Sequence, residues 1–112
     1  MELSDVQVKR ARELKAIAPD QFVVRDAELL TQGDIEEWAE AMGGFDLSGD
    51  NMNLPKMRRL AFQAAYKIGW FKEAPALSDE DFLLLPPMVV SRCGDMALAL
   101  YNKVTIPEVP FT

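Results

Sequence analysis

The segment from Pro55 to Trp70 constrains the fold more than any other, because apolar side chains cover most of its helical circumference. One apolar stripe along the predicted helix contains Met57, Leu60, Ala61, Ala64, Ile68 and Phe71. A second stripe contains Phe62, Tyr66 and Trp70, and the clearly polar strip is limited to Lys56, Arg59, Gln63 and Lys67. A helix that is apolar on so many sides must be covered by neighbours on more than one side. We therefore predict that it lies at the centre of the domain.

Two helices are predicted before this central helix. Ser4 and Gln7 can form a capping box, which begins a helix that ends before the first proline. Its outward side carries a basic cluster that either pairs with acidic neighbours or docks an acidic partner, and the cluster comprises Lys9, Arg10, Arg12 and Lys15. The second helix has a narrow apolar stripe with acidic residues opposite. Thr31 or Asp34 can cap its start, and Gly43 can end it.

Two more helices are predicted after the central one. Ser78 begins a short helical segment, which is broken by Pro86 and Pro87. Pro87 can serve as the first residue of a last helix, which extends to about Val104. Gly94 weakens this last helix, so it marks a candidate close crossing with another helix.

The combined pattern predicts an all-α fold, a small irregular bundle of four to five helices. We assign residues 1–104 to a single helical domain and residues 105–112 to an extended tail that contains prolines. The run Phe22–Val24 is short and partly β-branched, but no other segment is an obvious partner for it. We predict a loop there, with a strand as the alternative.

The charge of the chain bears on the kind of partner it can bind. The net charge is -6 and the pI is about 4.6, which disfavours non-specific binding to nucleic acid. Apolar runs are far shorter than the ~20 residues that span a bilayer, and no secretory leader pattern is present. We therefore expect a cytoplasmic protein that binds another protein and neither nucleic acid nor membrane.

The acid-rich loop before the central helix is the one candidate metal site. Asp46, Ser48 and Asp50 match the first three ligand positions of a calcium-binding EF-hand loop. Asn51 stands where that loop requires glycine, and Met57 stands where it requires a bidentate glutamate. We therefore interpret the loop as turn chemistry between two helices, and we expect no metal site.

Catalytic residue types are scarce in this sequence. The chain has no histidine, and its one cysteine, Cys93, falls on the apolar side of the last helix. Phosphate-binding loops and nucleophile motifs are absent from the sequence. We predict a non-enzymatic protein without a cofactor.

Protein binding is the remaining class of function, and six residues are candidate partner anchors. Three large aromatic residues could anchor an interface, although each also fits a buried helical stripe: Trp38, Trp70 and Phe71. Three apolar residues alternate with prolines in the tail, where an extended segment could pair with a partner's edge or groove: Ile106, Val109 and Phe111. Such anchors could also support self-association.

The order of these segments resembles the small tail assembly chaperones of long-tailed bacteriophages. The likeness covers about residues 29–104 and is carried by "LTQGDIEEWAEAMGG", "LPKMRRLAFQAAYKIGWF" and "LSDEDFLLLPPMVVSRCGDMALALYNKV". The first stretch is an acidic helix, the second an alanine- and aromatic-rich central helix, and the third leads into the proline-containing end.

This resemblance implies a helical binding protein of the host cell cytoplasm. It would hold the tape measure protein, and also contact the tail tube protein, until the tube polymerises. Two alternatives stay open. One is a virion adaptor at the head-to-tail joint, and the other is a small DNA-binding regulator that uses the helix from Pro55 to Trp70 for recognition.

Overall fold

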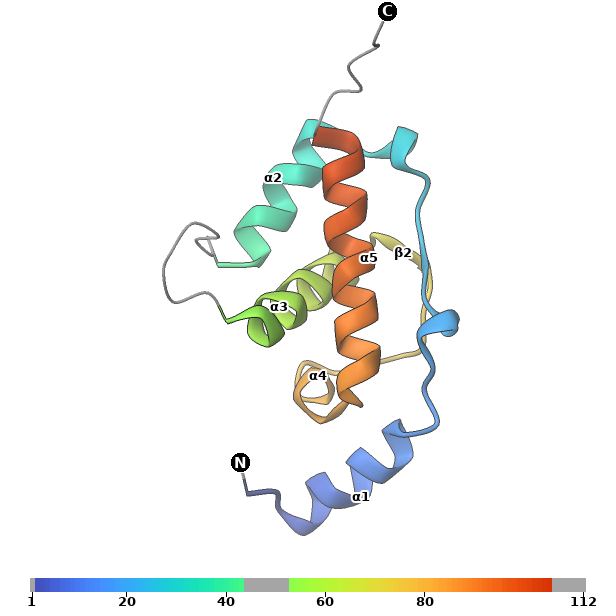
Figure 1. Ribbon diagram of the computed structural model, residues 1–112, viewed down its shortest axis with the longest axis vertical. Helices are drawn as coiled ribbons and strands as arrows, with labels where there is room; N and C mark the ends of the chain where they lie inside the picture. The colour runs from blue at the N-terminus through green and yellow to red at the C-terminus, as the bar shows by residue number, and fades with distance from the viewer. Residues whose placement is uncertain (1, 44–52, 106–112) are drawn as a thin grey trace, which may run out of the picture.

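The computed structural model describes residues 2–43 and 53–105 of the 112-residue chain. Within these residues the chain forms five α-helices, two short 3-10 turns and one two-stranded sheet (Figure 1). The helices are α1 (Asp5–Leu14), α2 (Gln32–Ala41), α3 (Leu54–Lys67), α4 (Asp81–Leu84) and α5 (Pro87–Thr105), and the strands are β1 (Val23–Val24) and β2 (Phe71–Glu73). This architecture confirms the prediction of a small, irregular and mostly helical bundle.

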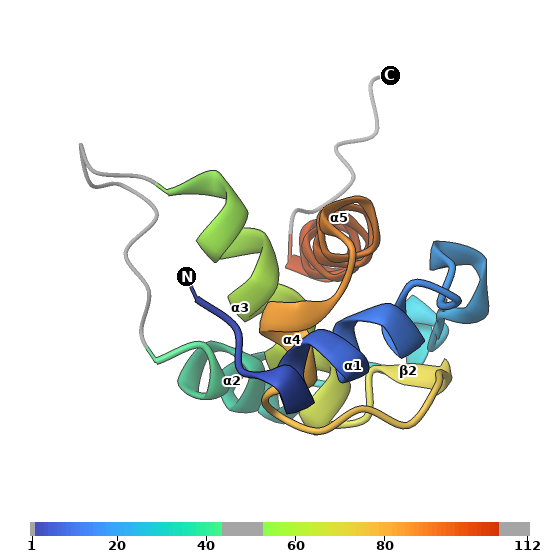
Figure 2. The same ribbon diagram turned by 90° about the horizontal axis from the view of Figure 1, so that it is seen from below.

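The longest helix, α5, organises the arrangement of the others. Helix α3 crosses α5 near its middle, α2 lies beside the end of α5 that contains Thr105, and α4 lies beside its start (Figure 1). Helix α1 packs on α4, as the view from below shows (Figure 2). None of the helices in the described ranges has the length and apolar character needed to cross a membrane.

Local signals at both ends of α3 explain its position in the sequence. The Asn53 side chain accepts a hydrogen bond from the Lys56 N–H at 3.1 Å, and Pro55 lies in the first turn. Gly69 ends the helix in a left-handed conformation with a φ of 82°. The Trp70 N–H then donates to the carbonyl of Ala65 at 2.9 Å, which completes a Schellman turn.

This turn corrects the predicted extent of the central helix. The helix ends at Lys67, so Trp70 and Phe71 do not belong to its stripes. Phe71 instead begins β2, which pairs antiparallel with β1. The short strand alternative at Phe22–Val24 is therefore correct for Val23 and Val24, and its pairing partner is the segment directly after Gly69.

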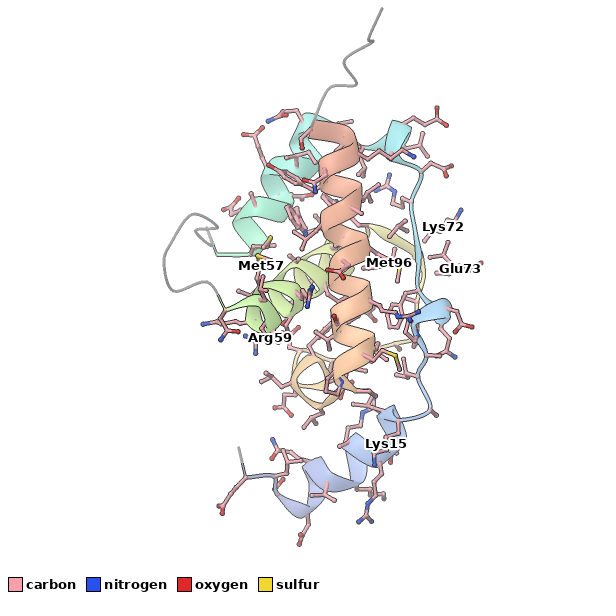
Figure 3. All side chains as sticks on the ribbon, in the orientation of Figure 1. Lys15, Met57, Arg59, Lys72, Glu73 and Met96 are labelled. Atoms are coloured by element: carbon pink, nitrogen blue, oxygen red, sulfur yellow. The ribbon has the colours of Figure 1, made fainter. Side chains whose placement is uncertain are left out.

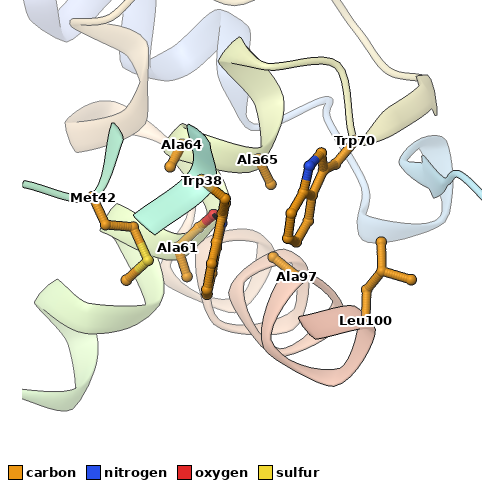
Figure 4. Packing of buried hydrophobic residues seen from close by; sticks show 8 residues of the cluster. All are labelled: Trp38, Met42, Ala61, Ala64, Ala65, Trp70, Ala97 and Leu100. Carbon is orange, nitrogen blue, oxygen red and sulfur yellow. Dashed lines mark hydrogen bonds between the residues drawn. The ribbon is translucent and has the colours of Figure 1, made fainter. Parts of the chain in front are cut away.

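Two clusters of buried residues lie on different sides of α3. The first joins α2, α3 and α5 and contains Trp38, Met42, Ala61, Ala64, Ala65, Trp70, Ala97 and Leu100 (Figure 4). The second joins α1, α3, α4 and α5 and contains Leu14, Phe22, Phe62, Phe82, Leu85, Val89 and Cys93. Because α3 contributes to both clusters, it must be apolar on two sides, as its sequence predicts.

Helices α3 and α5 approach each other closely at Gly94. A Cβ atom added there would lie 2.5 Å from the carbonyl oxygen of Arg58 and 2.8 Å from its Cα. Only a residue without a side chain leaves room for the backbone of α3 at this point. The structure thus confirms the crossing that the sequence predicts at Gly94.

Candidate functional site

A groove forms where the start of α3, helix α4 and the start of α5 meet. Its volume is about 630 Å³, within the ~300–1,000 Å³ range of ligand pockets. The residues that line it are Asn53, Pro55, Lys56, Arg58, Arg59, Phe82, Leu83, Leu85, Pro87, Val90 and Ser91. It lies at the end of α5 that begins with Pro87.

Two prolines set the shape of this end of the molecule. Leu85 is extended, with a ψ of 151°, because the residue before a proline is disfavoured in the helical region. This ends α4 after Leu84 and directs Leu85 into the second buried cluster. Pro87 then begins α5, where a missing N–H costs nothing. Helices α4 and α5 therefore meet at a sharp corner, and the groove lies against that corner.

Among the described residues, all charged residues that line the groove are basic. They are Lys56, Arg58 and Arg59, and all come from the first two turns of α3. Arg58 donates through Nε to Asp95 of α5 at 3.0 Å, and this pair is half-exposed. Arg59, labelled in Figure 3, has a buried Nε without a hydrogen-bond partner among the described residues. Although the chain has a net charge of -6, the groove is thus a basic surface that can attract a negatively charged group.

Apolar side chains are exposed in and beside the groove. Leu83 lines it and is 55% exposed. Met88, which follows the lining residue Pro87, is 60% exposed, and Leu54 at the start of α3 is 45% exposed. These are three of the six large hydrophobic residues that are exposed in the described part of the chain. Such a concentration of exposed apolar surface is typical of a site that another molecule covers.

An ion pair from α1 holds the wall of the groove in place. Arg10 of α1 binds Asp81 of α4 through both carboxylate oxygens, with Nε–Oδ1 and Nη2–Oδ2 distances of 2.9 and 2.8 Å. The Ser78 N–H also donates to Asp81 at 2.9 Å, and Asp81 is only 3% exposed. The guanidinium of Arg10 lowers the pKa of Asp81 to about 2. The predicted pairing of the α1 basic cluster with acidic neighbours is confirmed for Arg10, which also contacts Glu13.

Replacing Asp81 with asparagine tests this ion pair. We expect D81N to lower the free energy of unfolding at neutral pH by ~2 kcal/mol, because the shape is kept while the charged acceptor is lost. The pKa of Asp81 is depressed on folding, so its contribution is complete above its ordinary pKa and is lost as the pH falls from about 4 through about 2. The stability difference between wild type and D81N should shrink over that range. Urea unfolding followed by circular dichroism from pH 7 to pH 2 measures it.

Asp79 provides the matched control for this prediction. It lies two residues earlier and pairs with Lys67 at 3.2 Å, but its side chain is largely exposed. D79N should change the free energy of unfolding by less than ~0.5 kcal/mol, as is usual for exposed ion pairs. Equal effects of D79N and D81N would contradict a special role for the Arg10–Asp81 pair.

The structure places the predicted aromatic anchors away from the groove. Trp38 is 4% exposed and Trp70 is fully buried, with their rings stacked at a centroid distance of 5.1 Å (Figure 4). The Trp38 Nε1–H donates to the carbonyl of Ala61 at 3.1 Å. Both indoles are therefore core residues in this conformation, because their apolar area is covered by α3 and α5. Phe71 is partly buried on β2 and packs against Phe62.

The other candidate residues fall into two groups. The tail anchors Ile106, Val109 and Phe111 lie outside the described residues, and so do Asp46, Ser48, Asp50 and Asn51 of the acid-rich loop. Cys93 is buried as predicted, and burial raises the pKa of its thiol to about 12, which leaves it protonated and unreactive near neutral pH. Over residues 2–43 and 53–105, no cluster of His, Cys, Asp and Glu could hold a metal ion.

The groove is not apparent from the sequence, although some of its residues are. Lys56, Arg58 and Arg59 are visible as basic residues at the start of the central helix. The apolar half of the groove comes from α4 and α5, more than twenty residues later, and no local pattern reports that these segments meet. The sequence does show apolar residues, Leu83 and Met88, on either side of Pro86-Pro87, but only the structure shows that they are exposed.

Comparison with known proteins identifies no relative of this chain. No protein-family model matches the chain, and no curated protein or solved structure gives a significant match. The groove and the sequence resemblance are therefore the grounds for a functional proposal.

Proposed function

We propose that this chain is a non-enzymatic binding protein that holds a segment of another protein in the groove between α3, α4 and α5. The observation that carries the proposal is a groove that combines three cations with apolar side chains, of which Leu83 is 55% exposed. Interfaces are built in this way, with apolar anchors at the centre and charges that orient the partner. The basic groove stands apart from a chain whose net charge is -6.

The resemblance to tail assembly chaperones suggests which partner to test. In that role the chain would hold the tape measure protein in the host cytoplasm, and contact the tail tube protein, until the tail tube assembles. An acidic carrier suits this task, because net charge keeps the complex soluble while apolar surface on the partner is covered. The tail residues Ile106, Val109 and Phe111 remain predicted second contacts in this proposal.

Binding of tape measure fragments to the immobilised protein tests the proposal. We expect overlapping fragments of a tape measure protein from the same genome to be retained, and an unrelated helical protein of similar charge to be washed away. Deleting residues 106–112 should weaken retention if the tail is a second contact. Failure to retain any tape measure or tail tube fragment would overturn the tail assembly role.

One observation favours the DNA-binding alternative, which needs its own test. The cations of the groove lie on α3, the helix that would serve for recognition. However, α3 is packed on two sides by buried clusters, which limits the surface it could offer to a DNA groove. A salt-dependent mobility shift with duplex DNA at physiological ionic strength would favour the regulator. We expect no such mobility shift.

The other alternative, an adaptor at the head-to-tail joint, has a different test. An adaptor would be found in purified virions.

A further inference from the structure

We infer that the occupant of the groove is an amphipathic helix with carboxylates beside its apolar stripe. This inference deepens the proposed binding function, on which it rests, by naming the chemistry of the bound segment. Three independent features of the groove support it: the sign of its charges, the apolar residues at its edge and the helical nature of its walls.

The charges of the groove favour a negatively charged partner. Within residues 2–43 and 53–105, the lining cations Lys56, Arg58 and Arg59 have one ion-paired carboxylate, that of Asp95, which contacts Arg58 from α5. Lys56 is exposed and forms no ion pair with another described residue, so it can take up a new carboxylate at little desolvation cost. The start of α3 adds the partial positive charge of a helix N-terminus in the same place. A basic segment would be repelled at each of these points.

Apolar surface selects a partner with its own apolar stripe. Leu83 on α4 and Val90 on α5 line the groove, with Phe82 and Leu85 behind them in the second buried cluster. A volume of about 630 Å³ admits a few large side chains but not a folded domain. Side chains at i, i+3 and i+4 of a helix project together from one side, so they can fill such a groove as a group.

The walls of the groove favour a helical occupant over an added strand. Its lining residues belong to α3 and its cap Asn53, to α4, to α5 and to Leu85 between these two helices. Strand addition needs an open strand edge, and no lining residue belongs to β1 or β2. Helix-in-groove recognition requires only side-chain contacts, which this site offers.

Two acidic segments of this chain, α2 and residues 106–112, do not fit this description of the occupant. Helix α2 has an acidic outer side with Glu36, Glu37 and Glu40, but its apolar residue Trp38 is buried in its own core. The tail segment 106–112 has one carboxylate side chain, Glu108, to set against three cations. Neither segment offers apolar anchors and several carboxylates together.

A pair of synthetic peptides tests the inference. The first is a helix of about 18 residues, long enough to be helical, with leucines on one side and glutamates beside them. In the second, every glutamate is replaced by lysine. We expect the full-length protein to bind the glutamate peptide at least ~10-fold more tightly than the lysine peptide, with an affinity that falls as salt is added. Isothermal titration calorimetry measures both.

Charge reversal in the protein locates the binding site. Lys56→Glu should lower the affinity for the glutamate peptide by about tenfold and raise the affinity for the lysine peptide. Lys72→Glu is the matched control, because it makes the same change in net charge on exposed β2, far from the start of α3 (Figure 3). It should leave both affinities within about twofold. Leu83→Ser should lower the affinity for both peptides. Circular dichroism should show an unchanged fold, because Leu83 is already largely exposed.

The outcomes separate this inference from the tail assembly role. Equal binding of the two peptides, or equal effects of Lys56→Glu and Lys72→Glu, would overturn the inference even if tape measure fragments bind. Charge-selective peptide binding without any binding of tail proteins would uphold the inference and overturn the tail role. Peptide binding that appears only after residues 106–112 are deleted would assign the groove to the protein's own tail and overturn the inference.

Discussion

Gly94→Ala is expected to lower the free energy of unfolding by ~2 kcal/mol, although alanine is the better helix former. The added methyl group would overlap the backbone of Arg58, whose oxygen and Cα lie 2.5 and 2.8 Å away. Backbone atoms cannot rotate aside as a flexible side chain can, so α3 and α5 must separate. This cost exceeds the gain of ~1 kcal/mol that alanine brings within a helix. Urea unfolding followed by circular dichroism measures the change.

Gly33 supplies the control for this substitution. It lies in the first turn of α2, and a Cβ atom there would meet only the Thr31 side chain at an ordinary distance of 3.6 Å. Gly33→Ala should therefore leave stability unchanged or raise it by up to ~1 kcal/mol. A stabilising effect of Gly94→Ala similar to that of Gly33→Ala would contradict the close crossing of α3 and α5.

Trp38→Ala is expected to lower the free energy of unfolding by ~4 kcal/mol, more than Gly94→Ala. The indole of Trp38 stacks on Trp70 with an interplanar angle of 18°, and it contacts Tyr101 of α5. Its Nε1–H also binds the Ala61 carbonyl, so the side chain ties α2 to both α3 and α5. A loss of this size is a large part of the ~5–15 kcal/mol that stabilises a small domain. Chemical denaturation measures it.

Two further variants show whether Trp38 acts by packing. Trp38→Phe keeps an aromatic ring and should lose only about half as much stability as the alanine variant. Leu29→Ala removes an exposed apolar side chain and should cost less than ~0.5 kcal/mol. If Trp38→Ala were as mild as Leu29→Ala, the indole would not be a core residue, and the alternative role of Trp38 as a partner anchor would be favoured.

Helix boundaries were predictable where a side chain itself marks the end. Ser4 begins α1 with the capping box that the sequence predicts. Of the two candidate caps of α2, the structure has Thr31 at the N-cap, with Asp34 completing a capping box. The Asn53 side chain caps α3. The end of α3 was predicted too late because apolar spacing appears to continue through Trp70 and Phe71. Gly69 was the overriding signal, since only glycine readily adopts the left-handed conformation found there.

The candidate site was harder to predict because it depends on contacts distant in the sequence. The apolar stripe of α2 indicates that the Trp38 side chain is covered by other apolar groups, but it does not show whether these belong to the protein's own core or to a partner. The structure decides this by placing Trp70 against it. Likewise, the cations of α3 line a groove only because the turn between α4 and α5 at Pro86 places these two helices beside them. Such long-range arrangement has no local sequence signature.

The central claim is that a partner helix occupies the groove between α3, α4 and α5. Amide chemical shifts of the isotope-labelled protein, recorded while a tape measure fragment is added, test this claim most directly. We expect the perturbed amides to cluster around Lys56, Leu83 and Val90, with little change at Lys72 and Glu73 of β2. Saturable binding whose perturbed amides lie outside the groove would contradict the claim.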